Sequence, residues 1–283
     1  MRKTMHKAIF GCGLIFSILA FNNLIAKFSE SKSYIPDVCN TENNAFQAGE
    51  SITYKLYYNL GYLWVSAGEI TFSVTDVGRE YYLSAVGKTY KSYEWFFKVR
   101  DHYEAYVDKK TILPTRAYKT IAEGKYRMYE KIEYQQSQNK VISTRGKTKE
   151  NTKTAEYEVD NCMHDILSLI YYLRNIDIDK LDKDESVPMK IYMDREEWPL
   201  DLTFVEKIKE KKIKKLGRFD VIHLVPKVIV GDVFTEGTVM NIYASDDENR
   251  IPLLIESPVS VGSVKAVLKE YNGLKYDLTS MKK

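Results

Sequence analysis

The chain has 283 residues with 42 Lys and Arg against 39 Asp and Glu, and 44% of its residues are hydrophobic. Residues 1–26 contain three of the basic residues and no acidic ones, so the remainder holds 39 of each sign and is formally neutral. The charge therefore gives no reason to expect a nucleic acid as a partner.

The first 26 residues have the pattern of a secretory signal peptide. Arg2, Lys3 and Lys7 precede an uncharged run over 8–21, and the small residue Ala26 marks a cleavage site. We therefore expect an exported, periplasmic protein that begins near Lys27. An uncleaved N-terminal membrane anchor is the alternative, although the apolar run is shorter than the roughly 20 residues that a spanning helix needs.

Residues 27–48 show no regular period and are expected to be an irregular N-terminal segment. They contain Cys39, and only Cys162 would remain with it once Cys12 had left with the signal peptide. Two cysteines in an oxidising compartment can form one bridge, so we predict a Cys39–Cys162 disulfide. The alternative is that each is a small buried hydrophobic residue.

From residue 49 to the end, short segments alternate between apolar and polar side chains. The period of two is clear over Glu50–Asn59, again in Ile70, Phe72 and Val74, and from Lys125 onward, which is typical of half-buried strands. Turn residues such as Gly78, Gly124 and Gly262 separate these segments without long crossovers, which favours antiparallel pairing. No linker divides the region, so 49–283 is expected to be a single β-rich domain.

One segment has a helical period, with apolar residues at 163, 166, 167, 170 and 173. It predicts a helix over Met163–Arg174, capped by Asp160 or Asn161 and buried along Ile166, Leu167, Ile170 and Leu173. The expected fold is mainly β, with a large antiparallel curved sheet, half-barrel or sandwich covering this one substantial helix.

A helix of about twelve residues shields only part of a large sheet, so the remaining apolar face must close on itself, pack against a second sheet or hold a ligand. Tyrosines can line such a groove while keeping their hydroxyls near water or a headgroup, although they can equally be ordinary cross-strand packing residues. The candidate groove residues for a lipid or acyl ligand are Tyr54, Tyr58, Phe72, Tyr126, Met128 and Tyr134.

Several short motifs, in this order and spacing, resemble a known family. They are Gly49-Glu50, Gly68, Lys98-Val99 with Asp101, Tyr103 and Glu104, Leu113-Pro114, Asp165 to Tyr172-Leu173-Arg174, Gly217 with Phe219, Pro226, and Asp246 with Arg250 and Pro252. This chain is similar to the exported bacterial family catalogued as domain of unknown function 3108. The resemblance implies a mainly β envelope protein of a Gram-negative bacterium with no established activity, and it carries over no catalytic residues.

Polar side chains that could support chemistry are scattered. Asp101, His102 and Glu104 form the densest cluster, which we interpret as a structural ion pair on a strand face, with a catalytic or metal role as the weaker alternative. His223 has the setting of a core histidine, and the acidic run over 177–184 lacks the EF-hand spacing and glycine. We expect neither a metal nor another cofactor, and an enzyme is the least favoured class.

Six lysines between Lys207 and Lys215 surround a predicted hairpin. They could make peripheral contact with anionic headgroups, although a solvated hairpin that resists edge-to-edge aggregation is the simpler interpretation. Two functions are therefore carried forward. The first is a non-enzymatic envelope protein that binds a lipid or other amphiphile or assists envelope assembly, and the second is a structural or partner-binding β protein without a small ligand.

Overall fold

The computed structural model describes residues 36–60, 63–95, 97–228, 239–258 and 262–282. Residues 1–26, for which a signal peptide is predicted, lie outside this range. Among the described residues, no helix has both the length and the apolar composition needed to cross a membrane.

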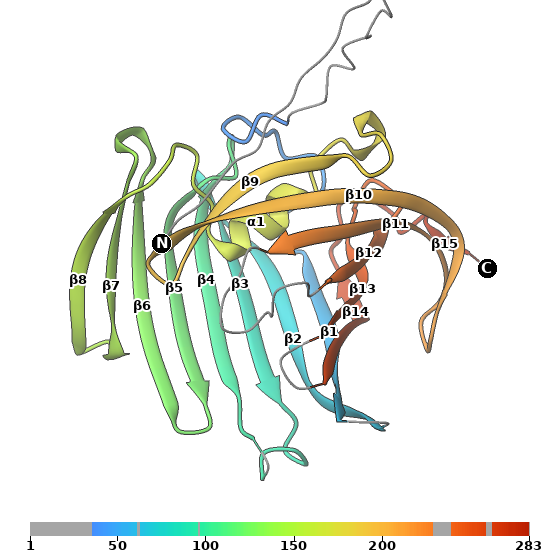
Figure 1. Ribbon diagram of the computed structural model, residues 1–283, viewed down its shortest axis with the longest axis horizontal. Coiled ribbons are helices and arrows are strands. Elements are labelled where there is room, and N and C mark those ends of the chain that lie inside the picture. The colour runs from blue at the N-terminus through green and yellow to red at the C-terminus, as the bar shows by residue number, and fades with distance from the viewer. Residues whose placement is uncertain (1–35, 61–62, 96, 229–238, 259–261, 283) are drawn as a thin grey trace, which may run out of the picture. The chain divides into compact units, whose positions relative to one another are not determined.

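The described chain forms one antiparallel sheet of fifteen strands around a single α-helix (Figure 1). The first eight strands are β1 (Ser51–Leu60), β2 (Leu63–Val77), β3 (Glu80–Thr89), β4 (Arg100–Asp108), β5 (Pro114–Glu123), β6 (Tyr126–Gln135), β7 (Lys140–Thr148) and β8 (Asn151–Glu158). After the helix come β9 (Ser186–Met193), β10 (Glu196–Ile213), β11 (Gly217–Val228), β12 (Asn241–Ser245), β13 (Pro252–Pro258), β14 (Ser263–Asn272) and β15 (Met281–Lys282). Short 3-10 helices occupy Gln136–Gln138 and Ile178–Lys180.

The strand order is β8-β7-β6-β5-β4-β3-β2-β1-β14-β13-β12-β11-β10-β9, with β15 paired to β11. Two meanders are therefore joined where the first strand pairs with β14, near the end of the chain. Within the described residues β8 and β9 end the sheet without pairing to each other, so the sheet is open rather than a closed barrel. The predicted mainly β, antiparallel fold that covers one helix is confirmed.

The helix α1 spans Ile166–Leu173 and is shorter than the predicted Met163–Arg174. His164 instead forms a parallel bridge with Ile191 of β9, so the chain becomes helical only after this residue. The cap is Asp165 rather than Asp160 or Asn161: its carboxylate accepts from the Ser168 N–H at 2.8 Å, and the Ser168 hydroxyl completes a capping box.

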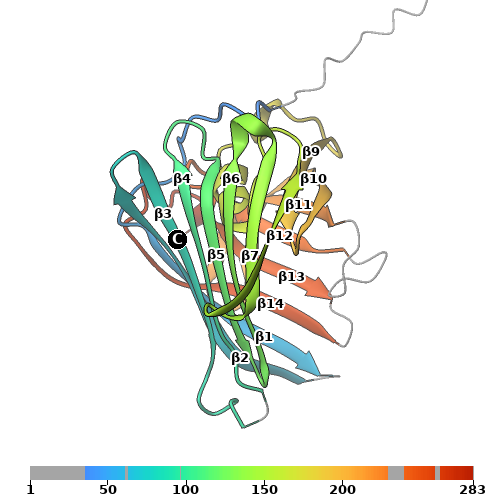
Figure 2. The same ribbon diagram turned by 90° about the vertical axis from the view of Figure 1, so that its left-hand side faces the viewer.

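The curved sheet surrounds α1, as Figures 1 and 2 show, so the helix is buried on more faces than one apolar stripe. Leu167, Leu169 and Tyr171 are at most 5% exposed, whereas Ile166, which was expected to be buried, is 40% exposed. Ile170 is half-buried. The helical period thus located the helix, but it did not identify the buried residues on its other sides.

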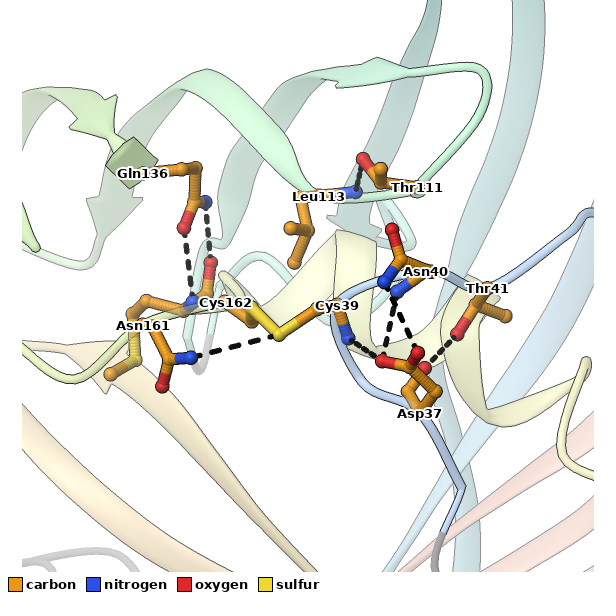
Figure 3. Close-up of a disulfide and its surroundings, with 10 residues drawn as sticks. Asp37, Cys39, Asn40, Thr41, Thr111, Leu113, Gln136, Asn161 and Cys162 are labelled. Atoms are coloured by element: carbon orange, nitrogen blue, oxygen red, sulfur yellow. Dashed lines mark hydrogen bonds between the residues drawn. A yellow bond between two sulfur atoms is a disulfide. The ribbon is translucent and has the colours of Figure 1, made fainter. Parts of the chain in front are cut away.

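The N-terminal segment is anchored by the predicted disulfide, which is confirmed (Figure 3). The Cα atoms of Cys39 and Cys162 lie 5.1 Å apart, within the range for a disulfide. Beside the bridge, the Gln136 side chain accepts from the Met163 N–H at 3.1 Å and donates to the Met163 carbonyl at 2.9 Å. Further along, Phe46 packs edge-on against Tyr171 of the helix with ring centroids 4.8 Å apart.

Candidate functional site

A cavity of about 310 Å³ lies between α1 and the concave face of the sheet. Its wall includes a row of cross-strand neighbours in which Leu56 pairs with Ala266, Ala266 with Ile255, Ile255 with Ile242, and Ile242 with Leu224. The row crosses five strands at one level, and each member faces the same side because side chains alternate along a strand. The result is a continuous aliphatic surface.

The helix side of the cavity is formed by Ile170, Tyr171 and Leu173, followed by Arg174. Deeper in the sheet, Tyr54 and Phe72 add aromatic surface and pack edge-on with ring centroids 5.8 Å apart. Burial raises the pKa of the Tyr54 hydroxyl, because the phenolate would be desolvated there. The tyrosine is therefore neutral, and the wall around it is apolar.

An ion pair closes one end of the cavity. Arg174 donates to both carboxylate oxygens of Glu50, at 2.5 and 2.8 Å, and to the Ala45 and Asn249 carbonyls. The two side chains are 5% and 0% exposed. The Glu50 carboxylate raises the pKa of Arg174 against the opposing effect of burial. Arg174 therefore stays charged and its charge is neutralised locally.

Exposure varies along the cavity wall. Ile52, Tyr171 and Arg174 are buried, whereas Leu56, Ile242, Ile255 and Ala266 are half-buried. The half-buried row lies within a few residues of the β1–β2 and β13–β14 turns, because Leu56 precedes the end of β1 by four residues and Ala266 follows the start of β14 by three. The cavity wall is therefore partly exposed beside these turns, and Ile170, Leu173, Arg250 and Pro252 on its helix side are half-buried as well.

The structure places the six predicted groove residues in different environments. Tyr54 and Phe72 line the cavity. Tyr58 is half-buried further along β1, Met128 and Tyr134 are buried, and Tyr126 is 53% exposed at the β5–β6 turn. β6 lies five strands away from β1 in the sheet order, so its residues do not reach this cavity. Sequence reasoning missed the row from Ala266 to Leu224, since its alignment depends on the register of strands that are distant in sequence.

The polar cluster is divided between the two faces of β4. His102 and Glu104 lie on one face with their side-chain atoms 3.6 Å apart, and Asp101 on the other face accepts from the Ala122 N–H at 3.0 Å. Ser84 of β3 lies 2.9 Å from His102 Nε2, a contact that sequence spacing does not reveal. Ser84, His102 and Glu104 together form a Ser–His–Glu series. At Ser84, however, β3 pairs with both β2 and β4. The backbone amides of these strands are therefore occupied and are not available to form an oxyanion hole.

The lysines of the predicted basic hairpin extend along β10 and into the turn that precedes β11. Lys207 pairs with Asp179 at 2.6 Å and with Asp246 at 2.9 Å, and Lys209 pairs with Asp220 at 3.1 Å. Among the described residues, no three acidic, histidine or cysteine side chains converge on a possible metal position. His223 is stacked on Tyr243 and lies 2.8 Å from the Asn241 side-chain oxygen.

These features define a class of protein: an open antiparallel β-sheet wrapped around one helix, with an apolar cavity between them. The model for the family described as protein of unknown function DUF3108 matches residues 53–269, and the chain belongs to this family. No curated protein matches the chain.

Among solved structures, the fold is similar to the crystal structure of a beta-barrel-like protein of domain of unknown function DUF1849 from Brucella abortus. The TM-score is 0.56 at 10% sequence identity, and the match covers 82% of this chain and 100% of that chain. At this identity the likeness concerns the fold alone.

Proposed function

We propose that this protein is a non-enzymatic, exported envelope protein that binds the acyl chain of a lipid or a similar amphiphile in the cavity beneath α1. The observation that supports this function is the aliphatic row from Leu56 to Leu224 facing an unfilled volume of about 310 Å³. Ligand sites typically occupy about 300 to 1,000 Å³ and are mostly apolar. Each methylene transferred from water into such a site contributes about 0.8 kcal/mol.

Two further observations are consistent with a chain-like ligand. Among the residues that the structure describes, the charged side chains in the cavity wall are Arg174, neutralised by Glu50, and Arg250, which donates to the Ile176 carbonyl. Both belong to the helix end of the cavity. An acyl chain that enters from the turns would therefore meet apolar side chains along the row and would leave its headgroup near the turns.

The direct test is thermal unfolding of delipidated protein with a series of fatty acids and lysophospholipids. A ligand that binds only the native state stabilises it by about 2.7 kcal/mol at 100 times its Kd. We expect Tm to rise with ligand concentration. A flat Tm across the series would contradict the proposal.

A substitution that fills the cavity separates binding in the cavity from adsorption elsewhere. Ala266→Phe places a ring in the aliphatic row and should abolish the ligand-dependent rise in Tm. Ala155→Phe is the matched control, because Ala155 is also a half-buried strand alanine but belongs to β8, at the far edge of the sheet. If both variants keep the ligand response, the ligand binds outside this cavity.

The partner-binding alternative has one observation in its favour. Within the described residues β8 pairs only with β7 and ends the sheet, so its other side could accept a strand from a partner. Lys153, Glu156 and Glu158 are exposed on β8, and charged edge residues of this kind discourage such pairing. The cavity therefore supports the ligand-binding function more directly.

A further inference from the structure

Three neighbouring turns at one end of the sheet expose large apolar side chains. They are the β1–β2 turn, the β3–β4 loop and the β5–β6 turn, and Figure 1 shows them along the lower edge. The exposed side chains are Leu63 at 68%, Trp64 at 37%, Trp95 at 84%, Phe97 at 45% and Tyr126 at 53%. We call the surface formed by the described residues of these three turns the turn face.

Backbone contacts hold the turn face together. In the β3–β4 loop, the Tyr90 N–H donates to Ala67 of β2 at 3.0 Å, and the Lys98 carbonyl accepts from the Gly124 N–H at 2.8 Å. A Cβ atom at Gly124 would lie 3.1 Å from the Phe97 ring, and Gly124 has a φ of +51°. The loop with the two aromatic residues is therefore fastened to the strands on both sides of it.

The turn face also carries a positive charge. Residues 90–98 contain Lys91, Glu94 and Lys98, residues 123–127 contain Glu123, Lys125 and Arg127, and residues 63–66 contain no charge. The net charge of the three turns is therefore +2, and all four basic side chains are exposed. Tryptophan and other large apolar residues beside lysine and arginine are the combination that enters the interface of an anionic bilayer.

We propose that the turn face docks on an anionic phospholipid surface, with Leu63, Trp95 and Phe97 entering the interface and the basic residues contacting lipid phosphates. This inference rests on the proposed function and extends it. The β1–β2 turn belongs to the turn face, and β1 leads into it four residues after Leu56, which lines the cavity. Docking would thus bring the side of the cavity nearer the turns towards the acyl chains of the bilayer.

A second basic surface of the same protein allows the effect of charge alone to be separated from the effect of exposed apolar side chains. The β10–β11 turn carries Lys214 and Lys215, and Arg218 follows in β11, but the neighbouring Ile213 is buried and Leu216 packs against the protein core. That turn can attract phosphates but offers no exposed Trp, Phe or Leu to the interface. If charge alone mattered, this turn would serve equally well.

The experiment is flotation of the full chain with vesicles of phosphatidylcholine containing phosphatidylglycerol and with vesicles of phosphatidylcholine alone. We expect binding to the anionic vesicles, falling at least about ten-fold in Lys91→Glu/Lys98→Glu and in Leu63→Ser/Trp95→Ser. The matched control Lys214→Glu/Lys215→Glu makes the same charge change at the other turn and should bind like the wild type. Tryptophan emission should shift to the blue on binding, and the shift should shrink in Trp95→Phe.

Loss of binding in Lys214→Glu/Lys215→Glu but not in Lys91→Glu/Lys98→Glu would overturn the proposal and assign docking to the β10–β11 turn. Equal binding to neutral and anionic vesicles, or no binding to either, would also overturn it. Circular dichroism of each variant shows whether it is folded. The fatty-acid titration of Tm is independent of vesicles, so a protein that binds fatty acids but not vesicles would retain the proposed function and lose only the docking surface.

Discussion

Arg174, directly after α1, forms a bidentate ion pair with Glu50, the residue before β1, and both side chains are buried. The pair joins the end of the helix to the start of the sheet across 124 positions of sequence. Arg174 also binds the Ala45 and Asn249 carbonyls. This single side chain therefore connects the N-terminal segment, the helix and the β12–β13 turn.

We predict that Arg174→Met destabilises the protein by about 3 to 5 kcal/mol, because it leaves the Glu50 carboxylate buried without its partner. The double variant Arg174→Met/Glu50→Leu should recover much of that loss, since no buried charge remains. Urea unfolding of the two variants measures both values. Equal destabilisation in the single and double variants would mean that the unpaired charge is not the cause.

His164 should make the protein sensitive to acid. Burial lowers its pKa to about 3, and its Nδ1 lies 3.0 Å from the Ser168 hydroxyl. Between pH values of about 6.5, the ordinary histidine pKa, and about 3, His164 binds a proton in the unfolded chain but not in the folded chain. The free energy of unfolding therefore keeps its full value with respect to His164 above a pH of about 6.5 and declines as the pH falls below it. The decline should approach about 1.4 kcal/mol per pH unit.

The comparison that isolates this effect is His164→Leu against the wild type at each pH. Burial raises the pKa of the neighbouring Asp165, which has the opposite effect on the pH dependence. The protonated Asp165 stabilises the folded state at low pH, and this stabilisation is lost as the pH rises. Asp165 is present in both proteins, so the difference between their unfolding free energies reports His164. Parallel pH profiles for the two proteins would show that His164 does not titrate as described.

The disulfide should contribute strongly to stability. It joins residues 123 positions apart, and closing a loop of that length in the unfolded chain is worth about 5 kcal/mol in the entropic model. Cys39→Ser/Cys162→Ser should therefore lower Tm markedly, and dithiothreitol should have the same effect on the wild type but none on the variant. An unchanged Tm after complete reduction would contradict this expectation.

Two neighbouring helix positions should differ in their tolerance of truncation. Leu167 is 2% exposed in the main core, so Leu167→Ala should cost about 2 to 5 kcal/mol. Ile170 is half-buried and faces the cavity, so Ile170→Ala should cost less in the absence of ligand because fewer packed neighbours are lost. Thermal or urea unfolding measures the two costs, and a larger loss at Ile170 would mean that the cavity is filled.

Local patterns in the sequence determined several features of this protein. The period of two marked β1, β2 and β6, the period of 3.6 located α1, and the two cysteines left after the first 26 residues indicated the bridge that the structure contains. These signals are local or depend on simple counting. They do not require knowledge of which strands are neighbours.

The tertiary structure alone decided the cavity, the Glu50–Arg174 pair and the Ser84–His102 contact. Leu56 and Leu224 line one wall because β1 pairs with β14 and three more antiparallel registers align them, although they are far apart in sequence. The start of α1 likewise depends on the bridge between His164 and Ile191. Strand register and the pairing of β1 with β14 are set by the packing of the whole sheet, and that packing carries no local sequence signature.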